Sequence, residues 1–145
     1  MFRIGIIGAG WIAEKMCDAI APFTDIEIYA IASRTTEKAE AFAAEHNIGK
    51  AYGSYEEMVC DPDIDLVYIA TPHSHHYDHA MLALEHGKPV LVEKAFTANA
   101  RQAKELIETA RSKGLFITEA IWTRYMPLSH KVREIMESGI IGEPR

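Results

Sequence analysis

FRIGIIGAGWIA, residues 2–13, is the stretch of sequence that decides the fold. It opens on a largely apolar, isoleucine-rich run from Phe2 to Ile7, which is typical of a strand buried on both faces of a sheet. Two glycines follow, and from Ile12 onward apolar residues recur at helical spacing. The stretch therefore predicts a strand, a glycine turn and a helix in direct succession.

The glycine turn has the spacing of a nucleotide cradle. Gly8, Gly10 and Ala13 form a G-x-G-x-x-A pattern between the predicted strand and helix, which is the context that this fingerprint requires. Gly8 permits the tight turn, Gly10 lets the backbone approach a pyrophosphate, and Ala13 keeps the helix close to the sheet. The N–H groups near Trp11 and Ile12 then point at the anion. The pattern predicts dinucleotide binding rather than a glycine turn without a ligand.

The rest of the chain continues the same alternation of strands and helices. Further strands are predicted at residues 26–32, 50–53, 65–70, 88–94 and 115–120. Helices are predicted to follow them at 36–47, 54–62, 77–86, 99–113 and 128–138, with Thr36, Ser54 and Asn99 as N-terminal caps. This order predicts an α/β fold with a doubly wound, mostly parallel sheet between two layers of helices, the three-layer Rossmann architecture.

Composition limits the partners and the cellular compartment. The 145 residues carry a net charge of −6, which argues against a nucleic-acid partner or an anionic membrane surface. Two cysteines, Cys17 and Cys60, do not suggest a disulfide framework, so a reducing cytoplasm is expected. The N-terminal apolar run is too short, and too interrupted by glycine, for a signal peptide or a membrane span.

The end of the second strand indicates which dinucleotide binds. Glu27 is acidic but lies at the wrong end of that strand to hold the ribose hydroxyls of NAD. The correct end reads Ser33-Arg34, with Lys38 one turn into the next helix. A small hydroxyl followed by a guanidinium suits a 2′-phosphate. NADP is therefore preferred over NAD, and the alternative is that Arg34 is only a solvated surface residue.

Three segments carry a resemblance to a known family: GIIGAGWIAEKM (5–16), YIATPHSHHYDHAMLALEHGKPVLVEKAF (68–96) and TEAIWTRYMP (118–127). With these motifs the sequence resembles the glucose-fructose oxidoreductase / inositol dehydrogenase family of NAD(P)-dependent dehydrogenases, and the last segment is most similar to its dihydrodiol dehydrogenase-like members. The resemblance implies an N-terminal cofactor domain over residues 1–145. A C-terminal domain for substrate binding and homo-oligomer assembly is expected to follow, because GIIGEPR (139–145) looks like the opening of something further.

The family pattern T-P-N-x-x-H implies positions beside the cofactor. It matches Thr71, Pro72, His73 and His76 here, after a strand whose carboxyl end faces the nucleotide side of the sheet. A second pattern, ending in Glu-Lys, matches Glu93 and Lys94 and implies contact with the nicotinamide region.

Lys94 is the residue that the resemblance assigns to catalysis. Its ammonium would polarise a carbonyl, or stabilise an alkoxide, while hydride passes to or from the nicotinamide. The alternative is a lysine at a strand end that simply reaches solvent. The family has proline after this lysine and the chain has Ala95, which leaves open how rigidly Lys94 is aimed. Trp122, Arg124 and Tyr125 are expected at the nicotinamide or substrate pocket, with packing as the alternative for the two aromatics.

The histidine-rich run PHSHHYDH (72–79) raises the question of a metal site. His75 and His79 have i, i+4 spacing with Asp78 nearby, but two ligands do not complete a site, and no third is evident. No metal is expected, and these two histidines are predicted to face solvent.

Four functional classes remain after this reading of the residues. The favoured one is an NADP-dependent dehydrogenase acting on a small molecule, a sugar-like alcohol or a trans-dihydrodiol, with this chain alone binding cofactor but turning over poorly. The second is a non-catalytic NAD(P)-binding sensor or scaffold module. The third is methyl transfer from S-adenosylmethionine, which would not explain Glu93 and Lys94 at the end of a strand. The fourth is a protein-interaction scaffold, which would bind no cofactor.

Overall fold

The computed structural model describes residues 1–142 and contains one six-stranded sheet. The strands are β1 (Phe2–Ile7), β2 (Ile26–Ala32), β3 (Lys50–Tyr52), β4 (Leu66–Ile69), β5 (Val90–Val92) and β6 (Ile117–Glu119). Every pairing is parallel, and the strand order is β3-β2-β1-β4-β5-β6. The predicted doubly wound sheet is confirmed, and its order reverses between β1 and β4, where ligands bind in open sheets of this kind.

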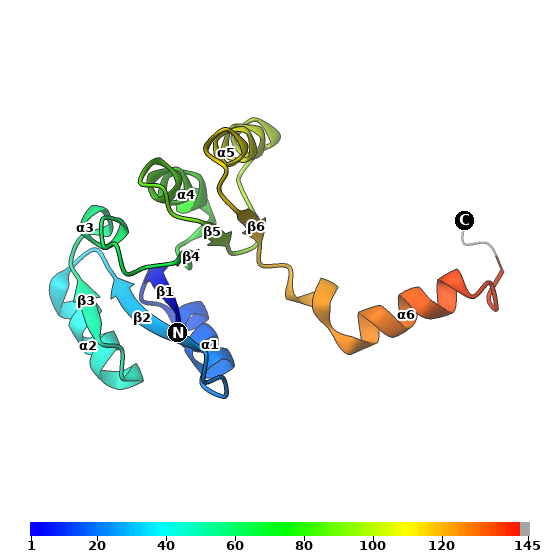
Figure 1. Ribbon diagram of the computed structural model, residues 1–145, viewed down its shortest axis with the longest axis horizontal. Coiled ribbons are helices and arrows are strands. Elements are labelled where there is room, and N and C mark those ends of the chain that lie inside the picture. The colour runs from blue at the N-terminus through cyan, green and yellow to red at the C-terminus, as the bar shows by residue number, and fades with distance from the viewer. Residues whose placement is uncertain (143–145) are drawn as a thin grey trace.

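Helices cover the two faces of the sheet unequally (Figure 1). They are α1 (Trp11–Ile20), α2 (Thr36–His46), α3 (Tyr55–Val59), α4 (His76–Glu85), α5 (Ala100–Lys113) and α6 (Pro127–Glu137), with 3₁₀ turns η1 (His73–His75) and η2 (Trp122–Tyr125). One buried cluster joins α1 and α2 to the sheet, and a second joins α3, α4 and α5 to it. The three-layer arrangement follows from right-handed crossovers that run in opposite directions from β1.

One predicted cap is wrong by a single residue. Thr35, not Thr36, caps α2: its backbone is extended, and its Oγ1 accepts a hydrogen bond from Lys38 N at 3.4 Å. Thr36 is already helical, and its side chain packs directly against Gly53. The caps predicted at Ser54 and Asn99 are confirmed, since each accepts a backbone N–H three residues on.

A buried carboxylate fixes the edge strand β3. Asp61 accepts hydrogen bonds from Lys50 Nζ at 2.8 Å, from Tyr52 OH at 2.6 Å and from Asp63 N at 2.9 Å. Burial by itself would raise the pKa of Asp61, but these bonds outweigh it and lower the pKa to about 2. The loop before β4 is thereby held against the edge of the sheet.

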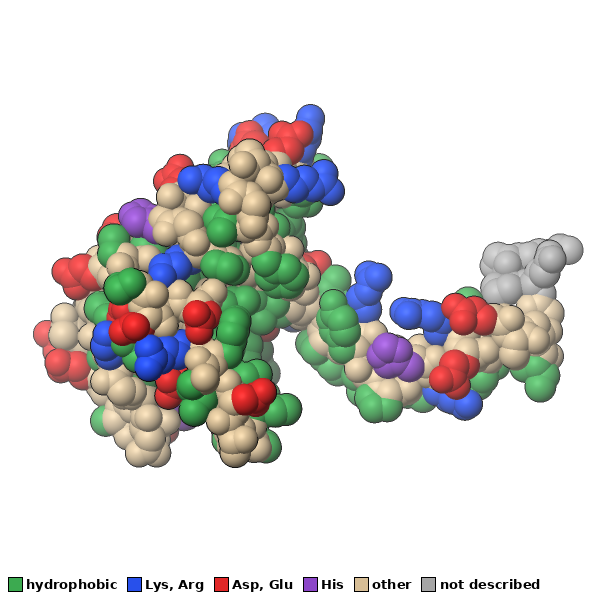
Figure 2. Space-filling model, in the orientation of Figure 1, with side chains coloured by type: hydrophobic (Ala, Val, Ile, Leu, Met, Phe, Trp, Pro, Cys, Tyr) green, Lys and Arg blue, Asp and Glu red, His purple; other side chains and the backbone are tan. Residues whose placement is uncertain are grey.

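The last helix stands apart from the body. The ribbon leaves β6 through η2 and continues into α6, which projects away from the sheet (Figure 1). Hydrophobic side chains are visible along it (Figure 2), and Leu128, Val132, Ile135 and Met136 are all exposed. The predicted helix is confirmed. No helix within residues 1–142 has both the length and the apolar character needed to cross a bilayer.

Candidate functional site

The glycine turn lies against the end of β4. Gly8 N donates to Ala32 O at 2.9 Å, and Gly8 has a φ of +106°, a conformation that favours glycine. A Cβ at this position would lie 2.9 Å from the carbonyl oxygen of Ala70. Gly10 precedes α1 in an extended conformation, with no other group within 4 Å of where its Cβ would stand. The first N–H groups of α1 therefore face open space at the switch point of the sheet.

A cavity of about 370 Å³ opens at this point. Its lining includes most of the residues that the sequence assigns to the nucleotide: Gly8, Gly10, Trp11, Ile12, Ser33, Arg34, Lys38, Thr71 and Pro72. The remaining lining residues are Ala9, Tyr55, Ala70, His75 and His79. The structure thus brings the ends of β1, β2 and β4 to one cavity, as the parallel topology requires.

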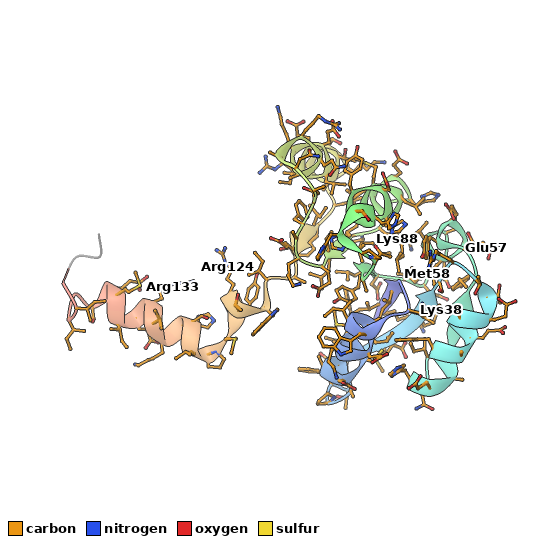
Figure 3. All side chains as sticks on the ribbon, turned by 180° about the vertical axis from the view of Figure 1, so that it is seen from behind. Lys38, Glu57, Met58, Lys88, Arg124 and Arg133 are labelled. Atoms are coloured by element: carbon orange, nitrogen blue, oxygen red, sulfur yellow. The ribbon has the colours of Figure 1, made fainter. Side chains whose placement is uncertain are left out.

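Two cations and one hydroxyl lie at the β2 side of this cavity. Ser33 is buried, and its backbone N–H donates to Tyr52 O at 3.1 Å. Arg34 is exposed and its side chain lines the cavity, and Lys38 follows on α2 (Figure 3). This concentration of positive charge in an acidic chain suits an anionic ligand group.

His76 does not line the cavity, contrary to the position that the resemblance implied. Its side chain is fully buried, with Nε2 at 2.8 Å from Thr71 O and Nδ1 at 2.8 Å from Ala95 O. Each ring nitrogen faces a backbone carbonyl, and one of them donates its N–H there, so the ring is turned toward the protein interior and away from the cavity. His73 is exposed and packs edge-on against His76 at 5.4 Å, also outside the cavity lining. Of the residues that match the family pattern, Thr71 and Pro72 line the cavity, and the contacts of His76 are internal.

The prediction that His75 and His79 face solvent holds for His75, which is exposed, but is wrong for His79, which is half-buried. Both line the cavity, and their rings stack with centroids 5.6 Å apart. His79 is half-buried, with Nδ1 3.0 Å from Thr71 Oγ1 and its ring 4.7 Å from that of Tyr55. Helical spacing showed that the two histidines share a face, but it could not show which way that face turns. Within residues 1–142, no three His, Cys, Asp or Glu side chains gather closely enough to hold a metal ion.

Tyr55 carried no signal in the sequence. It is the first residue of α3, and α3 begins the crossover from β3 to β4 that passes over the switch point. Only that topology could have placed its side chain at the cavity.

A second cavity, of about 520 Å³, lies between α1 and strands β4 to β6. Glu93, Trp122 and Tyr125 line it, and Ile12 lines both cavities. Trp122 and Tyr125 are therefore near Glu93, as expected of residues at a shared pocket. Arg124 is exposed and does not line it; Figure 3 places Arg124 on η2, well apart from Lys38.

The Glu93 carboxylate organises the end of β5. It is buried and accepts from Tyr68 OH at 2.6 Å and from Lys94 N at 3.1 Å. Burial, followed by this bond, raises the pKa of Tyr68 well above its ordinary value, so the phenol stays protonated and keeps donating. Lys94 itself is exposed and lines neither cavity, and the peptide bond between Lys94 and Ala95 is cis.

Comparisons with known proteins agree with this geometry. Residues 2–120 match the family model described as "Oxidoreductase family, NAD-binding Rossmann fold". The chain is 51% identical to D-xylose 1-dehydrogenase (NADP(+)) of Hypocrea jecorina over 95% of its own length and 38% of that protein. It is 42% identical to trans-1,2-dihydrobenzene-1,2-diol dehydrogenase of Mus musculus, over 99% of this chain and 44% of that one.

Solved structures give the same result. A 3-ketoreductase from Actinomadura kijaniata, in complex with NADP, superposes with a TM-score of 0.89 at 32% identity, over 98% of this chain and 45% of that one. An NAD binding oxidoreductase from Klebsiella pneumoniae superposes with a TM-score of 0.88 at 33% identity, over 95% of this chain and 39% of that one. The chain thus spans less than half the length of the relatives that it matches.

Proposed function

The chain belongs to the oxidoreductase family with an NAD-binding Rossmann fold, and we propose that it is the cofactor-binding part of an NADP-dependent dehydrogenase. The observation that carries this proposal is a single cavity that joins the glycine turn to Ser33, Arg34 and Lys38. The reaction is hydride transfer between NADP(H) and the CH–OH or carbonyl group of a small molecule, a sugar-like alcohol or a trans-dihydrodiol.

The residues of the first cavity fit the adenosine and pyrophosphate portion of NADP. The space beside Gly10 leaves room for a pyrophosphate at the N-terminus of α1, where backbone N–H groups and the helix dipole favour negative charge. Arg34 and Lys38 supply charge-assisted hydrogen bonds for a 2′-phosphate, and Ser33 supplies a small residue at the ribose.

The second cavity takes the nicotinamide side of the site. Ile12 borders both cavities, so an extended ligand that passes Ile12 reaches Glu93, Trp122 and Tyr125. When bound, the cofactor supplies or accepts a hydride at its nicotinamide ring. Lys94 is the proposed catalytic residue: its ammonium stabilises negative charge on the substrate oxygen. The Glu93 carboxylate accepts hydrogen bonds from the backbone N–H of Lys94 and from the hydroxyl of Tyr68. These two bonds fix the backbone at the end of β5, where Lys94 follows.

Relatives support the choice of NADP and the substrate class. The printed name of the Hypocrea protein specifies NADP(+), and the Actinomadura enzyme was solved with NADP. Because the chain covers only 38% and 45% of those proteins, we place the second acid/base residue, most of the substrate pocket and the homo-oligomer contacts outside these residues. Cys17 and Cys60 are free, which fits a reducing compartment such as the cytoplasm.

Titration of the chain with NADP and NAD, followed by the fluorescence of Trp11 and Trp122, tests the proposal. We expect saturable binding with NADP tighter than NAD. Arg34→Ala should weaken NADP by roughly tenfold to a hundredfold, the range for a lost charge-assisted hydrogen bond, and leave NAD nearly unchanged. Arg101→Ala is the matched control, because Arg101 is an exposed arginine on α5 whose partner is Glu105.

The outcomes of this titration are distinct. A chain that binds neither nucleotide contradicts the proposed function, and a chain that prefers NAD contradicts the role of Arg34. Turnover is measured separately with NADP and D-xylose or a trans-dihydrodiol. We expect little or none from the 145 residues alone, and an ordinary enzymatic rate would overturn the placement of the second acid/base residue elsewhere.

One observation favours the non-catalytic NAD(P)-binding module as a second candidate. Lys94, the proposed catalytic residue, lines neither cavity. We expect such a module to bind NADP and NAD in the titration in the same way as the dehydrogenase part does. It differs in turnover, which stays absent even when a substrate domain is joined to these 145 residues.

A further inference from the structure

We propose that Tyr55, His75 and His79 form the wall of the first cavity that contacts the adenine ring of the cofactor. This inference rests on the proposed function, and it assigns residues that the family motif leaves unassigned. The motif accounts for Thr71, Pro72, His73 and the internal His76, but for neither His75 nor His79.

The position of this wall follows from how the rest of the cavity is used. The glycine turn at Gly8 and Gly10 occupies one side and suits the pyrophosphate. Ser33 and Arg34 occupy the β2 side and suit the ribose with its 2′-phosphate. What remains of the lining is the start of α3 and the first turns after β4. The part of the nucleotide that remains is the base.

The three side chains form one continuous aromatic surface. The ring of His75 stacks on that of His79 at 5.6 Å with an interplanar angle of 24°, and His79 meets Tyr55 edge-on at 4.7 Å and 67°. His79 is held by Thr71 Oγ1 at 3.0 Å from its Nδ1, while His75 is exposed at the cavity. A fixed inner ring and an accessible outer ring offer flat faces on which a purine stacks.

The charge state of this wall suits a base better than a phosphate. Burial, and then the neighbouring His75, lower the pKa of His79 below its ordinary value, against the opposing carboxylates of Asp78 and Glu56. His79 is therefore neutral at pH 7. The permanent cations of the cavity, Arg34 and Lys38, come from the β2 side instead. The half-buried His79 ring on one side and the cations on the other match a neutral base joined to a phosphorylated ribose.

The test compares His75→Ala and His79→Ala with wild type for NADP, NAD and 2′,5′-ADP, which all contain adenine. Losing one stacking ring should weaken all three ligands by the same factor, roughly fivefold or more. His79→Phe, which keeps an aromatic ring but loses the bond to Thr71, should retain more affinity than His79→Ala. His130→Ala is the control, because His130 is an exposed histidine on α6 that lines neither cavity. Circular dichroism checks that each variant is folded.

Two results overturn the inference while leaving the proposed function intact. If the alanine variants weaken NADP and 2′,5′-ADP but not NAD, the histidines contact the 2′-phosphate and not the base. If folded His75→Ala and His79→Ala bind all three ligands as wild type does, there is no adenine wall at this position. Failure of the wild-type chain to bind NADP or NAD removes both the inference and the proposed function.

Discussion

Gly8 and Gly10 stand two residues apart in the same turn, yet alanine should act on them in opposite ways. At Gly8, with φ at +106°, an added methyl group would lie 2.9 Å from both Ala70 O and Thr71 Cγ2. The backbone carbonyl is part of the end of β4 and cannot move aside cheaply. At Gly10 the backbone is extended, with φ at −138°, and nothing lies within 4 Å of the added methyl.

The expected magnitudes follow from these contacts. A non-glycine residue in a sparsely populated backbone region costs about 1–3 kcal/mol. An overpacked contact costs about 1–3 kcal/mol more. Gly8→Ala should therefore lower the free energy of unfolding by about 2–6 kcal/mol. Gly10→Ala should change it by less than about 0.5 kcal/mol. Its methyl group would occupy the space for the pyrophosphate, so NADP binding should fall by about tenfold or more.

Urea unfolding followed by circular dichroism measures the free energy of unfolding, and NADP titration measures the affinity for the cofactor. The signature is a loss of stability in Gly8→Ala and a loss of binding in a fully stable Gly10→Ala. The reasoning is refuted if Gly8→Ala unfolds at the wild-type urea concentration. It is equally refuted if Gly10→Ala binds NADP with wild-type affinity.

Two further predictions concern buried polar side chains. Asp61→Asn should lower the free energy of unfolding by about 2 kcal/mol at pH 7, because its folded pKa of about 2 lies below the ordinary value for aspartate. A depressed carboxyl pKa stabilises the fold above about pH 4, and this contribution is lost as the pH falls toward 2. The difference between wild type and variant should therefore shrink over that range in urea titrations, and a constant difference would argue against the ionised pair. His76→Phe should lower the free energy of unfolding by about 2 kcal/mol, because it removes the ring between the carbonyls of Thr71 and Ala95 and leaves one buried acceptor without its donor; an unchanged unfolding midpoint would show that this contact contributes nothing.

The framework of the fold could be predicted from the sequence because its signals are local. β1 and β2 have the predicted bounds, since a buried parallel strand appears as a largely apolar run. The glycine pattern then predicted the turn between β1 and α1, which the structure confirms. The shorter strands were predicted too long: β5 by two residues at each end, and β6 by two residues at its start and one at its end, because the sequence motifs extend beyond the ladder hydrogen bonds.

The site was less predictable, because side-chain direction depends on packing between distant segments. His79 turns inward because Tyr55, from the β3 to β4 crossover, packs against it, and no sequence spacing links residues 55 and 79. His76 shows the converse. The resemblance implied a position beside the cofactor, whereas the structure turns both ring nitrogens of His76 toward backbone carbonyls.

The ring of His76 also connects two loops, the one after β4 and the one after β5. The ladder joining β4 to β5 ends at Ile69 and Val92, and beyond it the chains diverge. There the imidazole spans the gap from Thr71, in the lining of the first cavity, to Ala95, the neighbour of Lys94. Because a close-packed interior transmits displacement instead of absorbing it, a shift in either loop pulls on the other through this ring. His76 thereby links the peptide next to Lys94 to the loop that lines the first cavity.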